Sequence, residues 1–165
     1  MMFINYFFAS VISFLGLVIG TILVHIAPEE QKPLETKFSI MRKFCLLLIF
    51  GFMIFYYYNN LIYSLILVLS LIFLFFTEYK IKDLLEKSFF VYFIFGILFF
   101  LSSKNTNLFV IESSLILLYG LPTASLMYKI KKKNFKEIFF HNIVFIGVAN
   151  ILFLVNYHFS FLILK

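Results

Sequence analysis

The chain has 165 residues, of which 63% are hydrophobic and only 13% are charged, and its mean hydropathy is +1.03. Soluble domains are about 45–50% apolar and about 25% charged, so the composition excludes a soluble globular protein and indicates a multi-pass membrane protein. The net charge of +6 is compatible with nucleic acid or anionic lipid. In a membrane protein, however, the positions of the charges matter more than their sum. We therefore expect the lipid bilayer, and not nucleic acid, as the partner.

Six apolar runs follow one another along the chain and predict six transmembrane helices, because about 20 helical residues cross the hydrocarbon core of a bilayer. The first run lacks the basic start of a signal peptide and is interpreted as a retained span. The expected fold class is an all-α, polytopic membrane helix bundle that forms one integral membrane domain over residues 1–165. The runs cover about 3–27, 44–58, 61–77, 88–103, 108–128 and 138–164.

The distribution of Lys and Arg predicts the orientation of the bundle. The second and third runs are separated only by Asn59-Asn60, so they form either a helical hairpin or one long span. With a hairpin, segments 28–43, 78–87 and 129–137 lie on one side and carry 12 of the 14 basic residues. Basic residues in short loops stay in the cytoplasm. We therefore predict six spans, both termini on the non-cytoplasmic side, and a location in the cell membrane.

Small residues form a stripe on one face of the first predicted helix and another on the fifth. Such stripes let two helix backbones approach closely, and Gly-x-x-x-Gly is the best-known example. The first and fifth helices are therefore candidate neighbours, although contact with a second copy or with another membrane protein remains an alternative. The packing candidates are Ala9, Ser13, Gly16 and Gly20 in the first helix, and Gly120 and Ala124 in the fifth.

Glu112 is the one acidic residue inside the fifth apolar run. At 100° per residue, Tyr119 and Thr123 fall on the same face of the helix, so the helix carries a polar stripe. Three interpretations are open. The carboxylate extends to the outer interface, it forms a buried structural hydrogen bond, or it binds a proton or cation; the first is the ordinary expectation, because a charge facing acyl chains is costly.

The sixth predicted helix contains three asparagines, which indicates a face directed toward protein. Asn142, Ala149 and Asn156 share that face, and Asn156 and His158 are expected at the depth of Glu112. The candidates for a ligand or ion site are therefore Glu112, Tyr119, Thr123, Asn150, Asn156 and His158.

A second possible cluster lies at the predicted cytoplasmic ends of the first and sixth helices. Imidazole and carboxylate groups there suit a divalent metal or a lipid phosphate, but their spacing matches no established ligand motif, and no metal or cofactor is predicted. The single cysteine, Cys45, excludes an internal disulfide and a Cys-x-x-Cys site. The cluster contains His25, Glu29, Glu30, His141 and Asn142.

These features lead to three hypotheses about function. Because the sequence has no phosphate-binding glycine loop and no hydrolase or metalloprotease motif, the leading hypothesis is a small non-enzymatic membrane module, acting as a subunit or scaffold. The alternative is a small transporter, or a proton- or cation-coupled carrier, that uses Glu112. The third is a lipid-modifying membrane enzyme that acts at the cytoplasmic ends of the helices.

Overall fold

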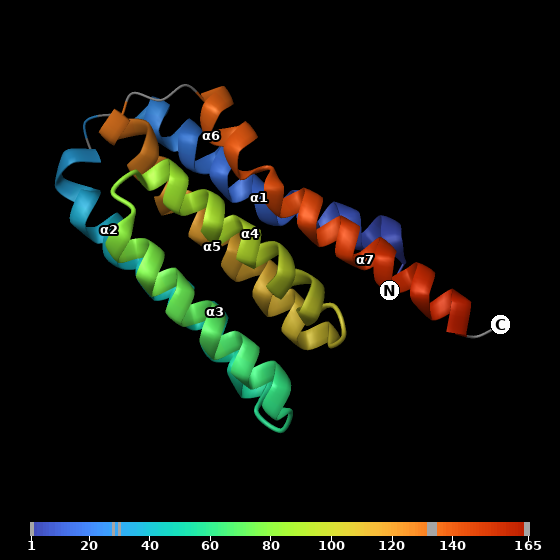
Figure 1. The fold of residues 1–165 in the computed structure, drawn as a ribbon. Coiled ribbons are helices and arrows are strands. Elements are labelled where there is room, and N and C mark those ends of the chain that lie inside the picture. Colours follow the sequence, from blue (N-terminus) through green and yellow to red (C-terminus); the bar gives the residue numbers. More distant parts are fainter. Residues whose placement is uncertain (1, 28, 30, 132–134, 164–165) are drawn as a thin grey trace.

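The computed structural model describes the backbone of residues 2–27, 29, 31–131 and 135–163, and the side chains of 2–27, 29, 33–127 and 135–158. The described chain is helical (Figure 1), with six stretches long and apolar enough to cross a membrane. This confirms the expected all-α bundle with six candidate spans. The helices are α1 (Phe3–Ile26), α2 (Gln31–Tyr57), α3 (Leu61–Lys80), α4 (Leu84–Ser102), α5 (Thr106–Lys131), α6 (Phe135–Asn142) and α7 (Val144–Ile163).

The second helix is much longer than its apolar run, because α2 begins at Gln31 rather than near residue 44. Pro33 is tolerated there, since the first turn of a helix needs no internal N–H donor. The buried face of α2 includes Arg42, Cys45 and Ile49, which recur at helical spacing. Most of the segment expected as a loop over 28–43 is therefore the beginning of α2.

The second and third runs form a hairpin and not one long helix. α2 ends at Tyr57 and α3 begins at Leu61. The side chain of Asn60 caps α3 by accepting a hydrogen bond from the backbone N–H of Tyr63 at 3.4 Å. The Tyr57 hydroxyl donates to the carbonyl oxygen of Leu101 at 2.7 Å and so ties the hairpin to the end of α4.

The sixth span is interrupted, because α6 and α7 are separated at Ile143. Asn142 donates its side-chain N–H to the carbonyl oxygen of Ile138 at 2.8 Å, where the helix would normally place a backbone donor. The Ser88 hydroxyl on α4 donates to the Asn142 side-chain oxygen at 2.7 Å. Both sides of the Asn142 amide are therefore paired inside the bundle.

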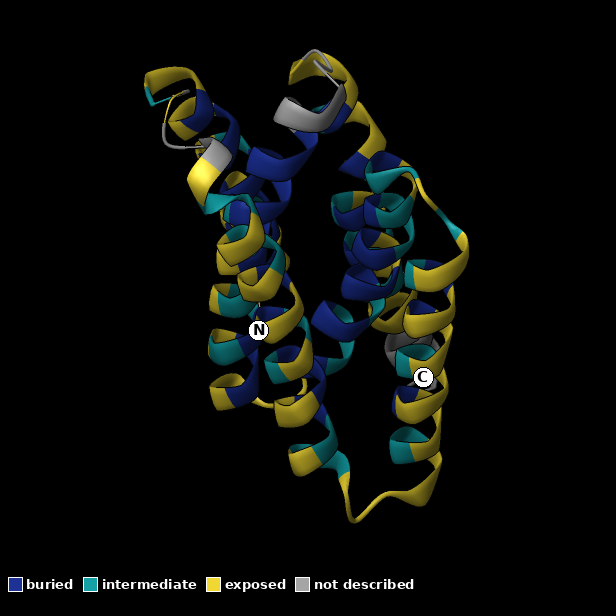
Figure 2. Ribbon diagram, turned by 90° about the vertical axis from the view of Figure 1, so that its left-hand side faces the viewer, coloured by how far each residue is buried: buried dark blue, intermediate teal, exposed yellow. Residues whose placement is uncertain are grey.

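The core of the bundle is formed around α5, which packs on α1, α2 and α4, while α7 packs mainly on α4 and α1. The α3 helix contacts only α2 and α4 among its substantial neighbours, so most of its surface is exposed. Buried residues lie on the inward faces of the helices, and exposed apolar residues cover the outside (Figure 2). This distribution is typical of a protein whose outer surface faces acyl chains.

The glycines of α1 lie directly against the backbone of α5. A Cβ atom added to Gly16 would overlap the carbonyl oxygen of Leu117, and one added to Gly20 would lie 2.5 Å from the carbonyl oxygen of Leu121. In the reverse direction, a Cβ on Gly120 would lie 2.6 Å from the backbone nitrogen of Leu17. We call this contact the α1/α5 seam; only residues without side chains permit such an approach.

The other small residues of the two stripes are buried or partly buried. Ala124 is fully buried, and its Cβ lies close to Gly20. Ser13 is buried and donates its hydroxyl hydrogen bond to the carbonyl oxygen of Ala9 at 2.9 Å, so its polar group is satisfied within its own helix. Ala9 packs against the edge of the hydrophobic core.

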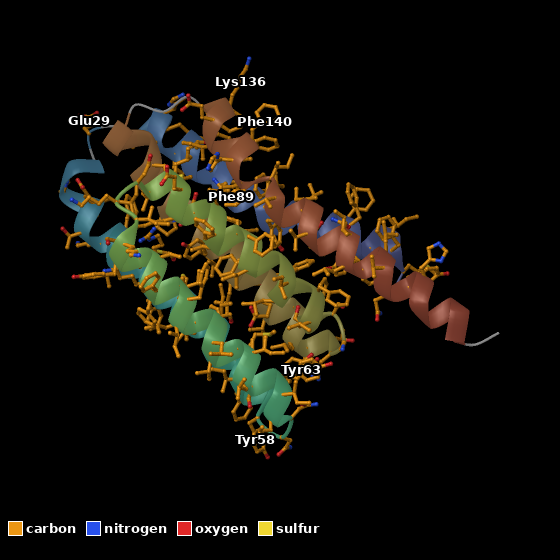
Figure 3. The ribbon with its side chains drawn as sticks, viewed as in Figure 1. Glu29, Tyr58, Tyr63, Phe89, Lys136 and Phe140 are labelled. Atoms are coloured by element: carbon orange, nitrogen blue, oxygen red, sulfur yellow. The ribbon has the colours of Figure 1, made fainter. Side chains whose placement is uncertain are left out.

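The bundle has two well-separated ends, which gives the orientation a direct test. Tyr58 and Tyr63 lie at one end, and Glu29 and Lys136 lie at the other (Figure 3). From the distribution of basic residues we predict that the second end is cytoplasmic. In a Cys45→Ala background, Asn59→Cys should react with a membrane-impermeant maleimide added outside intact cells, whereas Lys82→Cys should react only after permeabilisation. Both positions are exposed, so labelling of residue 82 from outside would contradict the orientation.

Candidate functional site

Glu112 is fully buried inside the bundle, with 0% of its surface exposed. Neither carboxyl oxygen has a hydrogen-bond partner within the part of the chain that the structure describes. The expectation that this side chain reaches the outer interface is therefore wrong. The physical reason is the central position of α5, which packs on α1, α2 and α4.

The polar stripe of α5 is buried along its length. Tyr119 is 1% exposed, and its ring packs edge-on against Phe95 and Tyr92 of α4 at centroid distances of 4.9 and 5.9 Å. Thr123 is fully buried and donates to the carbonyl oxygen of Tyr119 at 2.7 Å. Glu112 is thus the member of the stripe whose polar atoms remain unpaired, about 10 Å along the helix from Tyr119 at 1.5 Å per residue.

The polar residues of the sixth span do not join this site. Asn142 and Ala149 are buried, as expected for a protein-facing side, but Asn156 and His158 are exposed, because the last turns of α7 extend beyond the neighbouring helices (Figure 1). Asn150 donates to the Ser10 hydroxyl of α1 at 3.1 Å and to the carbonyl oxygen of Ile146 at 2.8 Å. Asn150 therefore joins α7 to α1, and Asn156 and His158 belong to the exposed surface of α7. None of the three forms a hydrogen bond with the Glu112 carboxyl.

The cluster expected near His25 is not assembled as a metal site. His25, Glu29 and His141 are exposed, and Glu30 lies outside the described residues. The His141 ring lies 5.4 Å from the ring of Phe89. Within the described chain, no group of three or more His, Cys, Asp or Glu residues is placed to hold a metal ion.

A second group of charged residues, which sequence reasoning missed, lies between α2, α3 and α4. Arg42 is 4% exposed, and its Nη2 donates to Glu78 Oε1 at 2.5 Å. Lys87 Nζ lies 3.6 Å from the same oxygen and donates to the carbonyl oxygen of Glu78 at 2.8 Å. The sequence signal was the helical spacing of Arg42 with Cys45 and Ile49, which extends the buried face of α2 to Arg42.

Comparison with known proteins does not assign the chain to a group. No protein-family model, no curated protein and no solved structure matches it. Any conclusion about function therefore rests on the two buried charged sites, the one at Glu112 and the one at Arg42.

Proposed function

We propose that this multi-pass membrane protein is a small proton- or cation-coupled carrier in which the Glu112 carboxyl is the binding group. The observation that supports the proposal is the complete burial of Glu112 without a hydrogen-bond partner among the described residues. A polar group left in this state normally destabilises a protein. Ionisable residues inside spans are expensive, and they frequently mark ion or proton pathways.

The packing of α1 on α5 weakens the hypothesis that the sequence favoured, that of a scaffold or subunit. That hypothesis was motivated by the two stripes of small residues, which are suitable for contact with a second copy or a partner. In this structure the two stripes contact each other across the seam at Gly16, Gly20 and Gly120. The stripes are therefore used within the chain and no longer argue for an external partner.

The chemistry of the site follows from the burial of the carboxyl. An ionised carboxylate is unfavourable in an apolar environment unless it is paired. A proton removes this penalty by neutralising the carboxyl, and a bound monovalent cation offsets part of it by pairing with the charge. In the proposed cycle, Glu112 carries the proton or cation while it is enclosed, and releases it when movement of the helices around α5 admits water.

The protonation of Glu112 can be measured without knowledge of any cargo. Infrared difference spectra between acidic and alkaline buffer should contain a carboxylic C=O band from a buried acid in the wild-type protein, because the enclosed carboxyl is neutral when it holds a proton. Glu112→Gln should lose this band, since an amide has no titrating carboxyl. Glu86→Gln is the matched control, because Glu86 is an exposed acid on the neighbouring helix α4.

The same variants test coupling to transport. In proteoliposomes that contain a pH indicator, we expect proton or cation flux with the wild-type protein and with Glu86→Gln, and its loss with Glu112→Gln. Equal flux through a folded Glu112→Gln protein, together with an unchanged infrared band, would contradict the proposal.

A further inference from the structure

A pocket of about 470 Å³ lies between α2, α3, α4 and α5, on the side of the bundle that contains Arg42 and Glu78. This volume lies within the range of roughly 300–1,000 Å³ that is usual for small-molecule sites. Glu112 is not among the lining residues, although Tyr119 of the same α5 stripe lines the pocket. Its lining includes Arg42, Lys43, Leu46, Leu47, Leu74 and Phe75.

At the charged end of the pocket, the Arg42 guanidinium has only part of its hydrogen-bonding capacity used. The guanidinium of Arg42 uses Nη2 to pair with Glu78, but Nη1 is buried and has no hydrogen-bond partner among the described residues. Glu78 already interacts with both Arg42 and Lys87. Lys43 also lines the pocket, so the lining residues include two cations, Arg42 and Lys43, and one acid, Glu78. The charged end therefore has an excess of positive charge and a free donor that favour an anion.

The rest of the pocket is apolar, and it lies on the membrane side of the charged end. On α2, Leu46 and Leu47 follow Arg42 and Lys43 by one helical turn toward the centre of the span. On α3, which runs in the opposite direction, Leu74 and Phe75 precede Glu78 and Tyr79 by one turn. Each helix therefore presents polar side chains at the end of its apolar run and apolar side chains one turn deeper.

We propose that this pocket binds a phospholipid with an anionic headgroup. Its phosphate would lie at Arg42 and Lys43, with Nη1 reaching it after a rotation of the Arg42 side chain, and one acyl chain would follow the apolar lining. Basic pockets between transmembrane helices are known to bind anionic headgroups, and a guanidinium is well suited to phosphate. The apolar part of the pocket favours a lipid over a free anion, because an acyl chain can pack against it and a free anion cannot. Its lining residues are Leu46, Leu47, Leu74 and Phe75.

Native mass spectrometry of the detergent-solubilised protein can test the proposal with phosphatidylglycerol as the probe. Phosphatidylcholine with identical acyl chains controls for headgroup charge, and inorganic phosphate controls for a free anion. Arg42→Gln removes the cation but leaves Lys87 beside Glu78, and Leu47→Trp fills the pocket from a half-exposed position without touching the ion pair. Lys82→Gln is the matched control, because Lys82 is exposed and does not line the pocket.

We expect the wild-type protein and Lys82→Gln to retain phosphatidylglycerol in preference to phosphatidylcholine. Arg42→Gln and Leu47→Trp should each weaken that binding about tenfold or more, as expected for a charged hydrogen bond or for a blocked site. Unchanged binding in folded Leu47→Trp, or equal binding of both lipids, would overturn the proposal. Displacement of the lipid by inorganic phosphate would also overturn it. Glu112→Gln should bind the lipid as the wild type does. The lipid-binding proposal and the carrier proposal for Glu112 can therefore be tested independently.

Discussion

Gly16→Ala should lower the free energy of unfolding by about 3 kcal/mol or more, at or above the upper end of the usual cost of overpacking. The added Cβ would overlap the carbonyl oxygen of Leu117, which is a backbone atom and cannot move away by a change of rotamer. The substitution must therefore separate α1 from α5 along the seam. Gly120→Ala should have a similar effect, because its Cβ would lie 2.6 Å from the backbone nitrogen of Leu17.

Two other glycines in the chain provide matched controls. Gly51 on α2 and Gly147 on α7 have no atom within 4 Å of an added Cβ. Gly51→Ala and Gly147→Ala should therefore be neutral, or stabilising by up to about 1 kcal/mol through helix propensity. Unfolding in mixed micelles, followed by circular dichroism, measures all four variants. If Gly16→Ala is as stable as Gly51→Ala, the α1/α5 seam is not a close backbone contact.

The sequence predicted features that depend on periodicity within one helix. The stripes around Gly16 and Gly120 were visible because residues three and four apart share a helix face, whatever the helix packs against. The six apolar runs were visible because hydropathy is a property of a local window. The hairpin between α2 and α3 also followed, since the positions of the basic residues favoured it over one long span.

Apart from the contact between the first and fifth helices, the sequence did not predict which helices face one another, and this decided the surroundings of Glu112. The sequence predicts that Asn156 shares a helix face with Asn142, but the last turns of α7 extend beyond its neighbours, so the shared face did not bring Asn156 to Glu112. Arg42 was assigned to a loop, because a hydropathy window ends where charges begin. The Arg42 guanidinium can be buried because it pairs with Glu78. The two residues are 36 positions apart, so no local sequence pattern predicts the pairing.

Glu112→Met should stabilise the protein, by about 1–3 kcal/mol, the usual cost of a buried polar group without a partner. Methionine has an unbranched, flexible side chain of about the same length as glutamate, so it can adapt to the same space without leaving a cavity. Neither oxygen of Glu112 has a hydrogen bond to lose among the described residues. Any proton- or cation-coupled flux should disappear at the same time.

Asn142→Leu is the matched control, because it also replaces a buried polar side chain by an apolar one, here with the same branched shape. Asn142 differs from Glu112 in that its amide accepts from Ser88 and donates to the carbonyl oxygen of Ile138. Its replacement should therefore destabilise the protein by about 1 kcal/mol or more. Opposite signs for the two variants, measured by the same unfolding assay, would show that Glu112 is retained at a cost to stability. Destabilisation by Glu112→Met would instead mean that the carboxyl has a structural partner, and the carrier hypothesis would lose its main support.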